Sequence, residues 1–524
     1  MKSYEPHIEA LQRREDKDRD ELVRLGKKPV LKRNFGFMSI LGFSCTVLIT
    51  WEGSLILFAQ GLANGGPAGV IYGFLFVWLG NLCVFSTLSE LASMAPTSGG
   101  QYHWVSMLAP RHCAKFLSYI TGWLTVGGWQ GSVASGGYLT GTLIQGLIAL
   151  TVPEYSPQPY QGTLLFWAVI FFAVFINAIV SSALPKFEGL ILILHILGFF
   201  AILLPLIILG PHGDAKSVFT TFYNQGGWPT QGLSFFVGII GNVFAFVGAD
   251  AAFHMSEEIH NPSVIVPRSI MLSILLNGTT GFAMVVALLF CIGNMDNALS
   301  TNTGYPFMEI FLQATHSVGG SAAMAAIITS LAVCATVGIL ASTSRMFWSF
   351  SRDHGLPFWR TLEKVDPRTS VPLWSIGVTT IISCLLALIN IGSATAFNDI
   401  ISLSVAGLYS SYLITTSLLL YRRCTGGFRM PDLSEFPALA NTKGAELIWG
   451  PWHIKGIYGI LNNTFACVYL TIILFFSFWP PATPVLASTM NYSSLVTGAV
   501  AIFSVVYYFA WAKKDYQGPI IEIQ

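Results

Sequence analysis

The chain has 524 residues, of which 53% are hydrophobic and only 10% are charged, and its formal net charge is +1 at pH 7. A soluble domain usually carries about 25% charged residues, so this composition indicates a membrane protein surrounded by a lipid bilayer. The near-zero net charge excludes the strongly basic surface typical of nucleic-acid-binding proteins, and we expect no nucleic acid partner.

The first 35 residues are predicted to be a cytosolic N-terminal tail. The polar run from His7 to Lys28 contains no apolar core of the kind that a signal peptide needs. A membrane domain is expected over residues 36–512, and residues 513–524 are expected to form a cytosolic C-terminal tail.

Twelve apolar stretches are long enough to cross a membrane as helices, since about 20 helical residues span some 30 Å of hydrocarbon. Glu52 lies near the middle of the first stretch, where a charge is costly unless it faces water, a partner or a ligand. The stretches lie near residues 37–61, 69–93, 116–149, 161–182, 189–210, 232–254, 269–292, 321–348, 373–391, 396–420, 456–479 and 485–511.

The Lys and Arg residues are distributed as in a protein whose two ends both lie in the cytosol. Positively charged loops are retained on the cytosolic side during membrane insertion. With the N-terminus inside, 26 of the 27 Lys and Arg residues lie in inside segments, and Lys216 is left outside. An even number of spans with both termini cytosolic is therefore predicted.

Glycines interrupt the first and the sixth apolar stretches. Gly53 follows Glu52 in the first stretch, and Gly241 and Gly248 precede Asp250 in the sixth. Transporters commonly bind their cargo near the middle of the membrane, where two such helices unwind. The two stretches are also the first helices of two five-span halves, so we expect a binding site between them.

Four motifs follow one another along the chain. They are LANGGPAGVIYGF (Leu62–Phe74), SELASMAPTSGGQYHWV (Ser89–Val105), SEEIHNPSVIVPRSI (Ser256–Ile270) and SRMFWSFSRDHGLP (Ser344–Pro357). In these motifs and their order the chain resembles the amino acid, polyamine and organocation superfamily. The long forms of the second and third motifs are most similar to the fungal branch of permeases for amino acids, choline and 4-aminobutyrate.

This resemblance implies an all-α membrane fold with twelve transmembrane helices. Ten of them would form an inverted five-plus-five repeat, with repeat one at about 36–210 and repeat two at about 232–420. The first and sixth helices would be discontinuous, and two additional C-terminal helices would lie at about 456–511.

The resemblance also implies a secondary active transporter that imports a small amino-containing solute, namely choline, an amino acid or 4-aminobutyrate. Import would proceed by alternating access with proton symport, across the plasma membrane. A channel or a non-transporting membrane sensor of the same solutes is the alternative. The chain contains no catalytic triad, no phosphate-binding loop and no cluster with metal-ligand spacing, so we expect neither an enzyme nor a cofactor or metal site.

Trp51, Glu52 and Gly53 stand where many permeases of the superfamily have a Gly-Ser-Gly type break that holds the substrate carboxylate. Glu52 adds negative charge at that point, which favours a cationic group, and the Trp51 ring can offer its face to a quaternary ammonium. A protonated, structural Glu52 and a proton-carrying Glu52 are the alternatives.

The sixth helix and its surroundings supply the other candidate substrate contacts. Phe244 and Phe246 match positions where relatives place an aromatic gate, and Gly248 and Asp250 follow them. Trp129 in the third stretch could face the same cavity. The simpler alternatives are a helix-capping role for Asp250, since a helix N-terminus favours negative charge, and ordinary packing for the aromatic residues.

Proton coupling is assigned to His195, together with Glu52. His195 lies in FEGLILILHILGFF (Phe187–Phe200), at a position where the resemblance implies a lysine in some proton-coupled relatives. Histidine titrates near physiological pH, although a lone helical histidine often serves only as a hydrogen bonder. Ion pairs near the cytosolic ends of the spans are expected from Glu90, Glu257, Glu258, Arg268, Arg345, Arg352 and Asp353.

Overall fold

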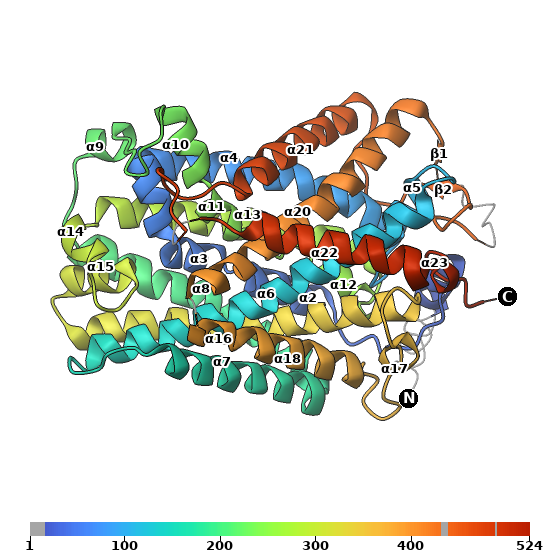
Figure 1. Cartoon of the computed structure of the whole chain (residues 1–524), viewed down its shortest axis with the longest axis horizontal. Coiled ribbons are helices and arrows are strands. Elements are labelled where there is room, and N and C mark those ends of the chain that lie inside the picture. The colour runs from blue at the N-terminus through green and yellow to red at the C-terminus, as the bar shows by residue number, and fades with distance from the viewer. Residues whose placement is uncertain (1–15, 393, 431–438, 488–489, 524) are drawn as a thin grey trace, which may run out of the picture.

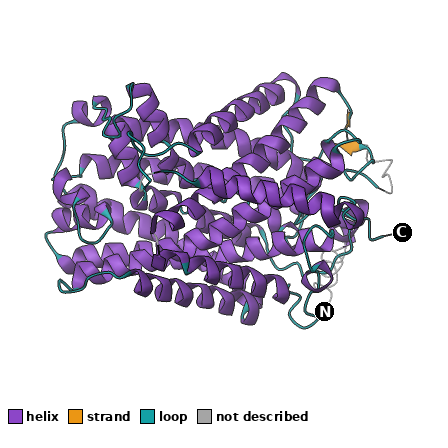
Figure 2. Ribbon diagram, viewed as in Figure 1, coloured by secondary structure: helices purple, strands orange, loops and turns teal. Residues whose placement is uncertain are grey.

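The computed structural model describes residues 16–392, 394–430, 439–487 and 490–523. It is a bundle of helices that run side by side along the long axis, with the two chain termini at the same end (Figure 1). Eleven helices within the described residues are long and apolar enough to cross a membrane. The expected helical membrane protein is therefore confirmed, and Figure 2 shows how little strand accompanies the helices.

The long helices account for eleven of the twelve expected spans. They are α2 (Phe37–Leu48) with α3 (Thr50–Ile56), α4 (Phe58–Met94), α6 (Ala114–Thr151), α7 (Pro159–Val174), α8 (Leu184–Leu209), α13 (Pro262–Phe290), α16 (Val318–Arg352), α18 (Leu373–Ala387) with α19 (Ile389–Gly392), α20 (Ala394–Thr425), α21 (Gly456–Ser477) and α22 (Ser493–Tyr507).

Shorter elements connect them. They are α5 (Gln101–Leu108), α9 (Ala215–Thr220), α10 (Gln231–Gly238), α11 (Ile240–Phe244), α12 (Ala251–His254), α14 (Met295–Leu299), α15 (Pro306–Thr315), α17 (Trp359–Leu362), α23 (Lys513–Asp515), the π-helices Phe175–Ile179 and Tyr508–Ala512, the 3-10 turns Ser181–Ala183 and Ser256–Glu258, and the parallel strands β1 (Phe428–Arg429) and β2 (Leu447–Ile448).

Several observed helix ends differ from the expected span boundaries, and the sixth and last spans illustrate the differences. The sixth, over residues 232–254, is divided into α10, α11 and α12. None of these three helices is long enough to be one of the eleven membrane-spanning helices. The last begins at Ser493 instead of residue 485. Just before this start, the side chain of Asn491 donates to the carbonyl oxygens of Ser477 and Trp479 and accepts from the Ser493 N–H.

The centre of the bundle is formed by α6, which packs against α16 and α20. Helices in membranes approach closely where small residues face each other. Gly128 on α6 faces Gly407 on α20, and a Cβ added at Gly407 would lie only 3.0 Å from the Gly128 Cα. This close contact keeps α6 in place beside the two broken helices described below.

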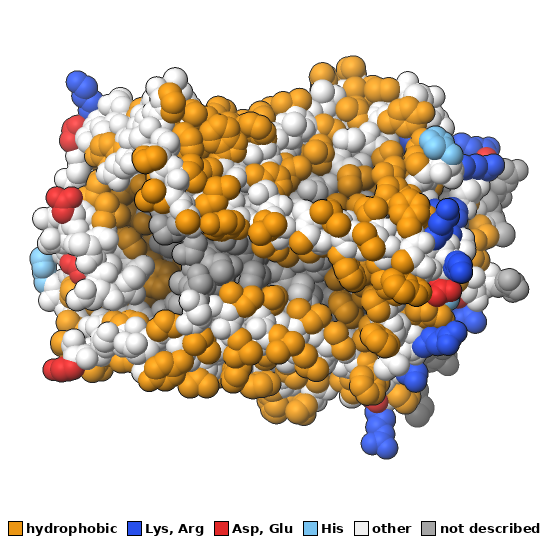
Figure 3. All heavy atoms as spheres, viewed as in Figure 1, with side chains coloured by type: hydrophobic (Ala, Val, Ile, Leu, Met, Phe, Trp, Pro, Cys, Tyr) orange, Lys and Arg blue, Asp and Glu red, His pale blue; other side chains and the backbone are white. Residues whose placement is uncertain are grey.

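Charged side chains gather at the two ends of the bundle, and apolar side chains cover the surface between them (Figure 3). Most of the Lys and Arg side chains in this view lie at the end that also carries both termini. We call this end the terminal face; it is built around Lys27, Arg352, Asp353 and Glu522. The other end is called the opposite face.

Candidate functional site

The first broken helix is interrupted at Ile49, between α2 and α3. Ile49 has φ 38° and ψ 43°, a left-handed conformation that is unusual for a β-branched residue. The break thus precedes Trp51, Glu52 and Gly53, which the sequence analysis had placed at the break itself and which form the first turn of α3. Tertiary packing supports the earlier position, because the newly exposed Thr50 N–H donates to Asn277 Oδ1 on α13 at 3.4 Å.

The second broken helix is interrupted between Phe244, where α11 ends, and Ala251, where α12 begins. Gly248 lies in this interval with φ 97°, a conformation that side chains other than glycine rarely adopt. A Cβ at Gly248 would also lie 3.1 Å from Val47 Cγ1 on α2. The two breaks therefore contact each other through a point that requires glycine.

A cavity of about 60 Å³ lies between the two breaks. By the same measure a water molecule needs roughly 10–15 Å³, so the cavity has room for a few waters. A larger ligand requires the surrounding helices to move apart. The cavity is lined by Val47, Leu48, Ile49, Gly53, Ile56, Leu57, Trp129, Ser132, Ser135, Gly136, Leu139, Thr140, Phe244, Ala245, Val247, Gly248, Ala332, Ala335, Thr336 and Ile339.

Four of the candidate substrate residues line this cavity, namely Gly53, Trp129, Phe244 and Gly248. Phe246 does not; it is fully buried and packs against the Phe74 ring, with 5.3 Å between the ring centroids. Trp51, Glu52 and Asp250 are also fully buried and are not part of the lining. The structure thus brings half of the candidates to one surface and leaves the others behind it.

Hydroxyl groups that the sequence analysis did not single out complete the lining. Ser132, Ser135 and Thr140 lie on α6, and Thr336 on α16 faces Thr140 with 3.4 Å between the hydroxyl oxygens. The α6 residues follow the spacing of a single helix face, together with Gly136. This spacing was available in the sequence, but only the fold identifies the face that meets the cavity.

Asp250 is held behind the cavity wall. Its Oδ2 accepts hydrogen bonds from Gln101 Nε2 at 2.9 Å and from Trp129 Nε1 at 3.2 Å, and His254 Nε2 lies 3.4 Å away. Asp250 precedes α12 as the capping interpretation expected, but its side chain forms no capping hydrogen bond. Its carboxylate instead fixes the indole ring of Trp129, whose other atoms line the cavity.

Glu52 and His195 contact each other directly. His195 Nδ1 on α8 lies 2.8 Å from Glu52 Oε1 on α3, and both side chains are fully buried. The Trp51 ring packs beside the imidazole, with 5.7 Å between the ring centroids. The second carboxyl oxygen of Glu52 and the His195 Nε2 have no hydrogen-bond partner within the described chain. The two candidates for proton coupling therefore form one pair on the α8 side of α3.

A family model described as "Amino acid permease" matches residues 35–501. This chain belongs to the amino acid permease family. The match confirms the resemblance that the sequence motifs indicated, and it covers both broken helices and the cavity between them. The members of this family are transporters, so the permease is a membrane transporter rather than a member of an enzyme family.

Relatives cover nearly the whole permease. A putative amino acid/polyamine transporter of Macrophomina phaseolina is 31% identical over 456 residues, which are 87% of this chain and 97% of the relative. A choline transporter of Saccharomyces cerevisiae is 30% identical over 505 residues, 96% of this chain and 85% of the relative. An amino-acid permease of Arabidopsis thaliana is 27% identical over 526 residues, 97% of each.

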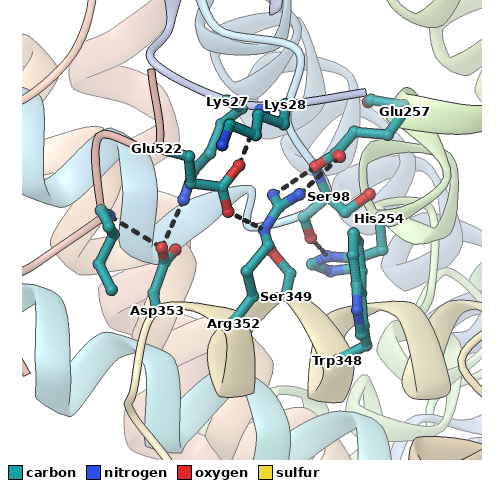
Figure 4. A network of polar contacts seen from close by, with 12 residues as sticks. Lys27, Lys28, Ser98, His254, Glu257, Trp348, Ser349, Arg352, Asp353 and Glu522 are labelled. Carbon is teal, nitrogen blue, oxygen red and sulfur yellow. Dashed lines mark hydrogen bonds and ion pairs between the residues drawn. The ribbon is translucent and has the colours of Figure 1, made fainter. Parts of the chain in front are cut away.

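Ion pairs join the residues after the second break to α16 near the terminal face. Arg352, at the end of α16, donates to both carboxyl oxygens of Glu257 at 2.8 and 3.0 Å (Figure 4), and Arg345 Nε donates to Glu258 Oε1 at 2.7 Å. Burial alone would raise the pKa of Glu257, but the Arg352 guanidinium outweighs it and lowers that pKa. These pairs confirm the expected ion pairing for Glu257, Glu258, Arg345 and Arg352 and connect the second broken helix to α16. Glu90 pairs with Arg423 on α20, whereas Arg268 is exposed and forms no ion pair within the described residues.

Both tails of the permease cover these ion pairs. Lys27 forms an ion pair with Asp353, which also accepts from the Ile520 N–H at 2.8 Å. Glu522 accepts from the Lys28 N–H at 2.7 Å and lies 3.6 Å from Arg352 Nε (Figure 4). The sequence predicted two cytosolic tails without contacts, because nothing in their local sequence indicates which folded residues they contact.

Proposed function

We propose that this permease imports a small organic solute with a cationic nitrogen by alternating access. The observation that carries the proposal is the position of the cavity, which lies between two interrupted helices. Interrupted helices expose backbone groups that can bind a solute in the middle of a membrane. The ion pairs of Glu257 and Glu258 lie between the second break and the terminal face, and import by this route would require them to separate.

The proposed architecture has twelve membrane helices. Its sixth helix is the divided segment α10, α11 and α12, and the fold comprises an inverted repeat over about 36–210 and 232–420 followed by two helices at about 456–511. In support, α2 and α10 each begin one of these halves, and each leads into a break that borders the cavity.

We place the terminal face in the cytosol and the permease in the plasma membrane. The gathering of Lys and Arg side chains at the terminal face supports this orientation, because positive segments are retained inside. An epitope tag at Gln524 is then reached by antibody only after cells are permeabilised. Labelling of that tag in intact, sealed cells would reverse the orientation.

The proposed substrates are choline, an amino acid or 4-aminobutyrate. No Lys or Arg belongs to the described lining of the cavity, whereas the carboxylates of Glu52 and Asp250 lie behind it. This arrangement attracts a cationic nitrogen, and the rings of Trp129 and Phe244 can contact it. The hydroxyls of the lining would bind a substrate carboxylate, if there is one. The relatives that are named as choline and amino acid transporters agree with this class.

Proton symport is assigned to Glu52 and His195 because the two groups share a short contact at the side of the first break. A proton bound by this pair adds one positive charge to it. The change alters the charge beside α3 and therefore the charge that a bound solute experiences. The pair thus offers a way for proton binding and solute binding to influence each other.

An uptake panel tests the proposal. Cells that lack their own permeases express the chain and receive radiolabelled choline, 4-aminobutyrate, lysine or alanine, with and without a protonophore. Saturable uptake that collapses with the proton gradient is the expected result. A channel would instead give uptake that does not saturate, and a sensor would give none. Surface labelling of the tagged protein verifies that equal amounts reach the membrane.

A further inference from the structure

Glu188 is a buried carboxyl group that the proposed mechanism has not used. It lies one turn into α8, its side chain is fully buried, and α8 is one of the helices long enough to cross the membrane. Neither of its carboxyl oxygens has a hydrogen-bond partner in the described part of the chain. Unpaired ionisable side chains within membrane helices are rare, and they generally mark a pathway for ions or protons.

Glycines bring two neighbouring helices close to Glu188. A Cβ at Gly42 on α2 would lie 2.5 Å from the Glu188 carbonyl oxygen, and a Cβ at Gly338 on α16 would lie 3.7 Å from Glu188 Oε1. The Thr46 hydroxyl on α2 stands beside the carboxyl, but it already donates to the Gly42 carbonyl at 2.8 Å. The carboxyl is therefore enclosed by α2, α8 and α16 without a committed donor.

Among the described residues, no Lys, Arg or His forms an ion pair with Glu188. Its helix packs against α2, α13, α15 and α16, and the Cys334 thiol on α16 is a titratable group of these helices that interacts electrostatically with Glu188. The titratable side chains on these helices and on α8 itself are Cys45, Lys186, His195, Arg268, Glu309, Cys334, Arg345 and Arg352. An ionised carboxylate in this position is strongly disfavoured, so the closed arrangement favours a bound proton.

Glu188 lies between the Glu52–His195 pair and the terminal face. It precedes His195 by seven residues on α8, which is two turns on the same helix face and about 10 Å along the axis. Glu188 contacts Gly42, near the beginning of α2. Just before α2, Phe35 pairs with Ile259, which follows the ion-paired residues Glu257 and Glu258. His195, in contrast, contacts Glu52 on α3. A proton moving from the pair to the terminal face therefore passes the level of Glu188.

We propose that Glu188 is a second proton-binding group, which receives the transported proton from the Glu52–His195 pair and releases it to the cytosol. The imidazolium of His195 gives its proton to water that enters between the helices, and the water passes a proton to the Glu188 carboxylate. When the terminal face opens, the carboxylic acid transfers that proton to cytosolic water and becomes ionised. The inference rests on the proposed proton symport.

Transport by purified protein in proteoliposomes tests this role with Glu188→Gln. The probe is whichever solute of the panel (choline, 4-aminobutyrate, lysine or alanine) the wild type takes up most. Exchange of external for internal probe requires no net proton release, so it should stay within about twofold of wild type. Gradient-driven accumulation should fall by roughly 100-fold, since a positioned proton-transfer group contributes typically 10²–10⁴-fold. Glu188→Asp should restore part of the accumulation.

The control is Glu309→Gln. Glu309 lies on α15, which also packs against α8, but its carboxylate already accepts a hydrogen bond from Gln313 Nε2 at 3.3 Å. This variant should accumulate the probe like wild type. Unchanged accumulation in Glu188→Gln, or an equal loss of exchange and accumulation, would overturn the proposal.

An infrared measurement separates this proposal from the coupling proposal. Difference spectra between about neutral and alkaline pH should contain the C=O band of a protonated carboxyl in wild type and lack it in Glu188→Gln. If wild-type uptake ignores the proton gradient, the symport proposal fails. If the band persists unchanged in Glu188→Gln, Glu188 is not the group that binds the proton.

Discussion

His195 Nδ1 lies 2.8 Å from Glu52 Oε1, and the contact joins α8 to the first turn of α3 in the middle of the bundle. The two residues are 143 positions apart in the chain, and both are fully buried. Because the two side chains are in direct contact, a change to one alters the surroundings of the other. Functional tests of one residue therefore also test the other.

A double-mutant cycle should reveal this coupling. Glu52→Gln and His195→Gln should each flatten the pH profile of uptake, because either change leaves the pair unable to exchange its proton. The double variant should resemble the single variants, since contacting residues commonly couple by about 0.5–3 kcal/mol. His212→Gln, in an exposed loop, is the control. Effects of the two changes that simply add would contradict the pairing.

Phe244 and Phe246 should separate substrate contact from packing. Phe244 lines the cavity, so Phe244→Ala should raise the KM for a cationic probe such as choline by roughly two- to thirtyfold, the equivalent of a cation–π contact of about 0.5–2 kcal/mol. Phe246 packs on Phe74, so Phe246→Ala should lower the unfolding midpoint in detergent by removing about 3–5 kcal/mol. The idea fails if Phe246→Ala changes KM more than Phe244→Ala does.

Gly248 should not tolerate a side chain. Gly248→Ala strains a backbone at φ 97° and brings the new Cβ within 3.1 Å of Val47 Cγ1, so we expect a loss of at least about 1 kcal/mol of stability and much slower uptake. Gly377→Ala on α18 is the matched control, because a Cβ there meets no atom within 4 Å. Thermal unfolding and uptake of both variants measure the difference, and equal behaviour would argue against a tight contact between the breaks.

Arg352 should be far more important for stability than an exposed arginine. Arg352→Gln leaves Glu257 buried without its partner, and breaking a buried pair typically costs about 3–5 kcal/mol. Arg429→Gln breaks an exposed pair with Glu446, for which about 0–1 kcal/mol is typical. Unfolding midpoints of the two variants in the same detergent compare these costs. Similar midpoints would mean that the Arg352–Glu257 ion pair contributes little to the stability of the fold.

Acid should weaken the ion pairs of Glu257 and Asp353 only at low pH. Burial would raise the pKa of Asp353, but Lys27 and Arg352 outweigh it, so the folded pKa lies below the unfolded value, as it does for Glu257. A carboxyl group whose pKa is lower in the folded than in the unfolded chain stabilises the fold at pH values above its unfolded pKa of about 4. This stabilisation is lost as the pH falls through the folded pKa. The unfolding midpoint should therefore stay level near neutral pH and fall below about pH 4. Glu257→Gln should make the acid dependence shallower, and an unchanged slope would count against this assignment.

Local properties of the sequence were sufficient to predict most of the membrane helices and the approximate positions of both breaks. An apolar stretch crosses a membrane because its own backbone satisfies its hydrogen bonds, so its length and hydropathy decide the outcome. Gly248 could be identified in the same way, since its conformation depends on the lack of a side chain. The sequence motifs indicated the family, and the match over residues 35–501 confirmed it.

Tertiary structure alone decided which buried polar groups meet. Hydropathy identified Glu52 as costly, but its partner His195 lies on a helix whose rotation and position depend on packing with α2. Packing also moved the first break to Ile49, turned Asp250 toward Gln101 and left Glu188 without a partner. Each result depends on contacts between residues far apart in the chain, and a helix sequence defines its own faces but not the neighbours that those faces meet.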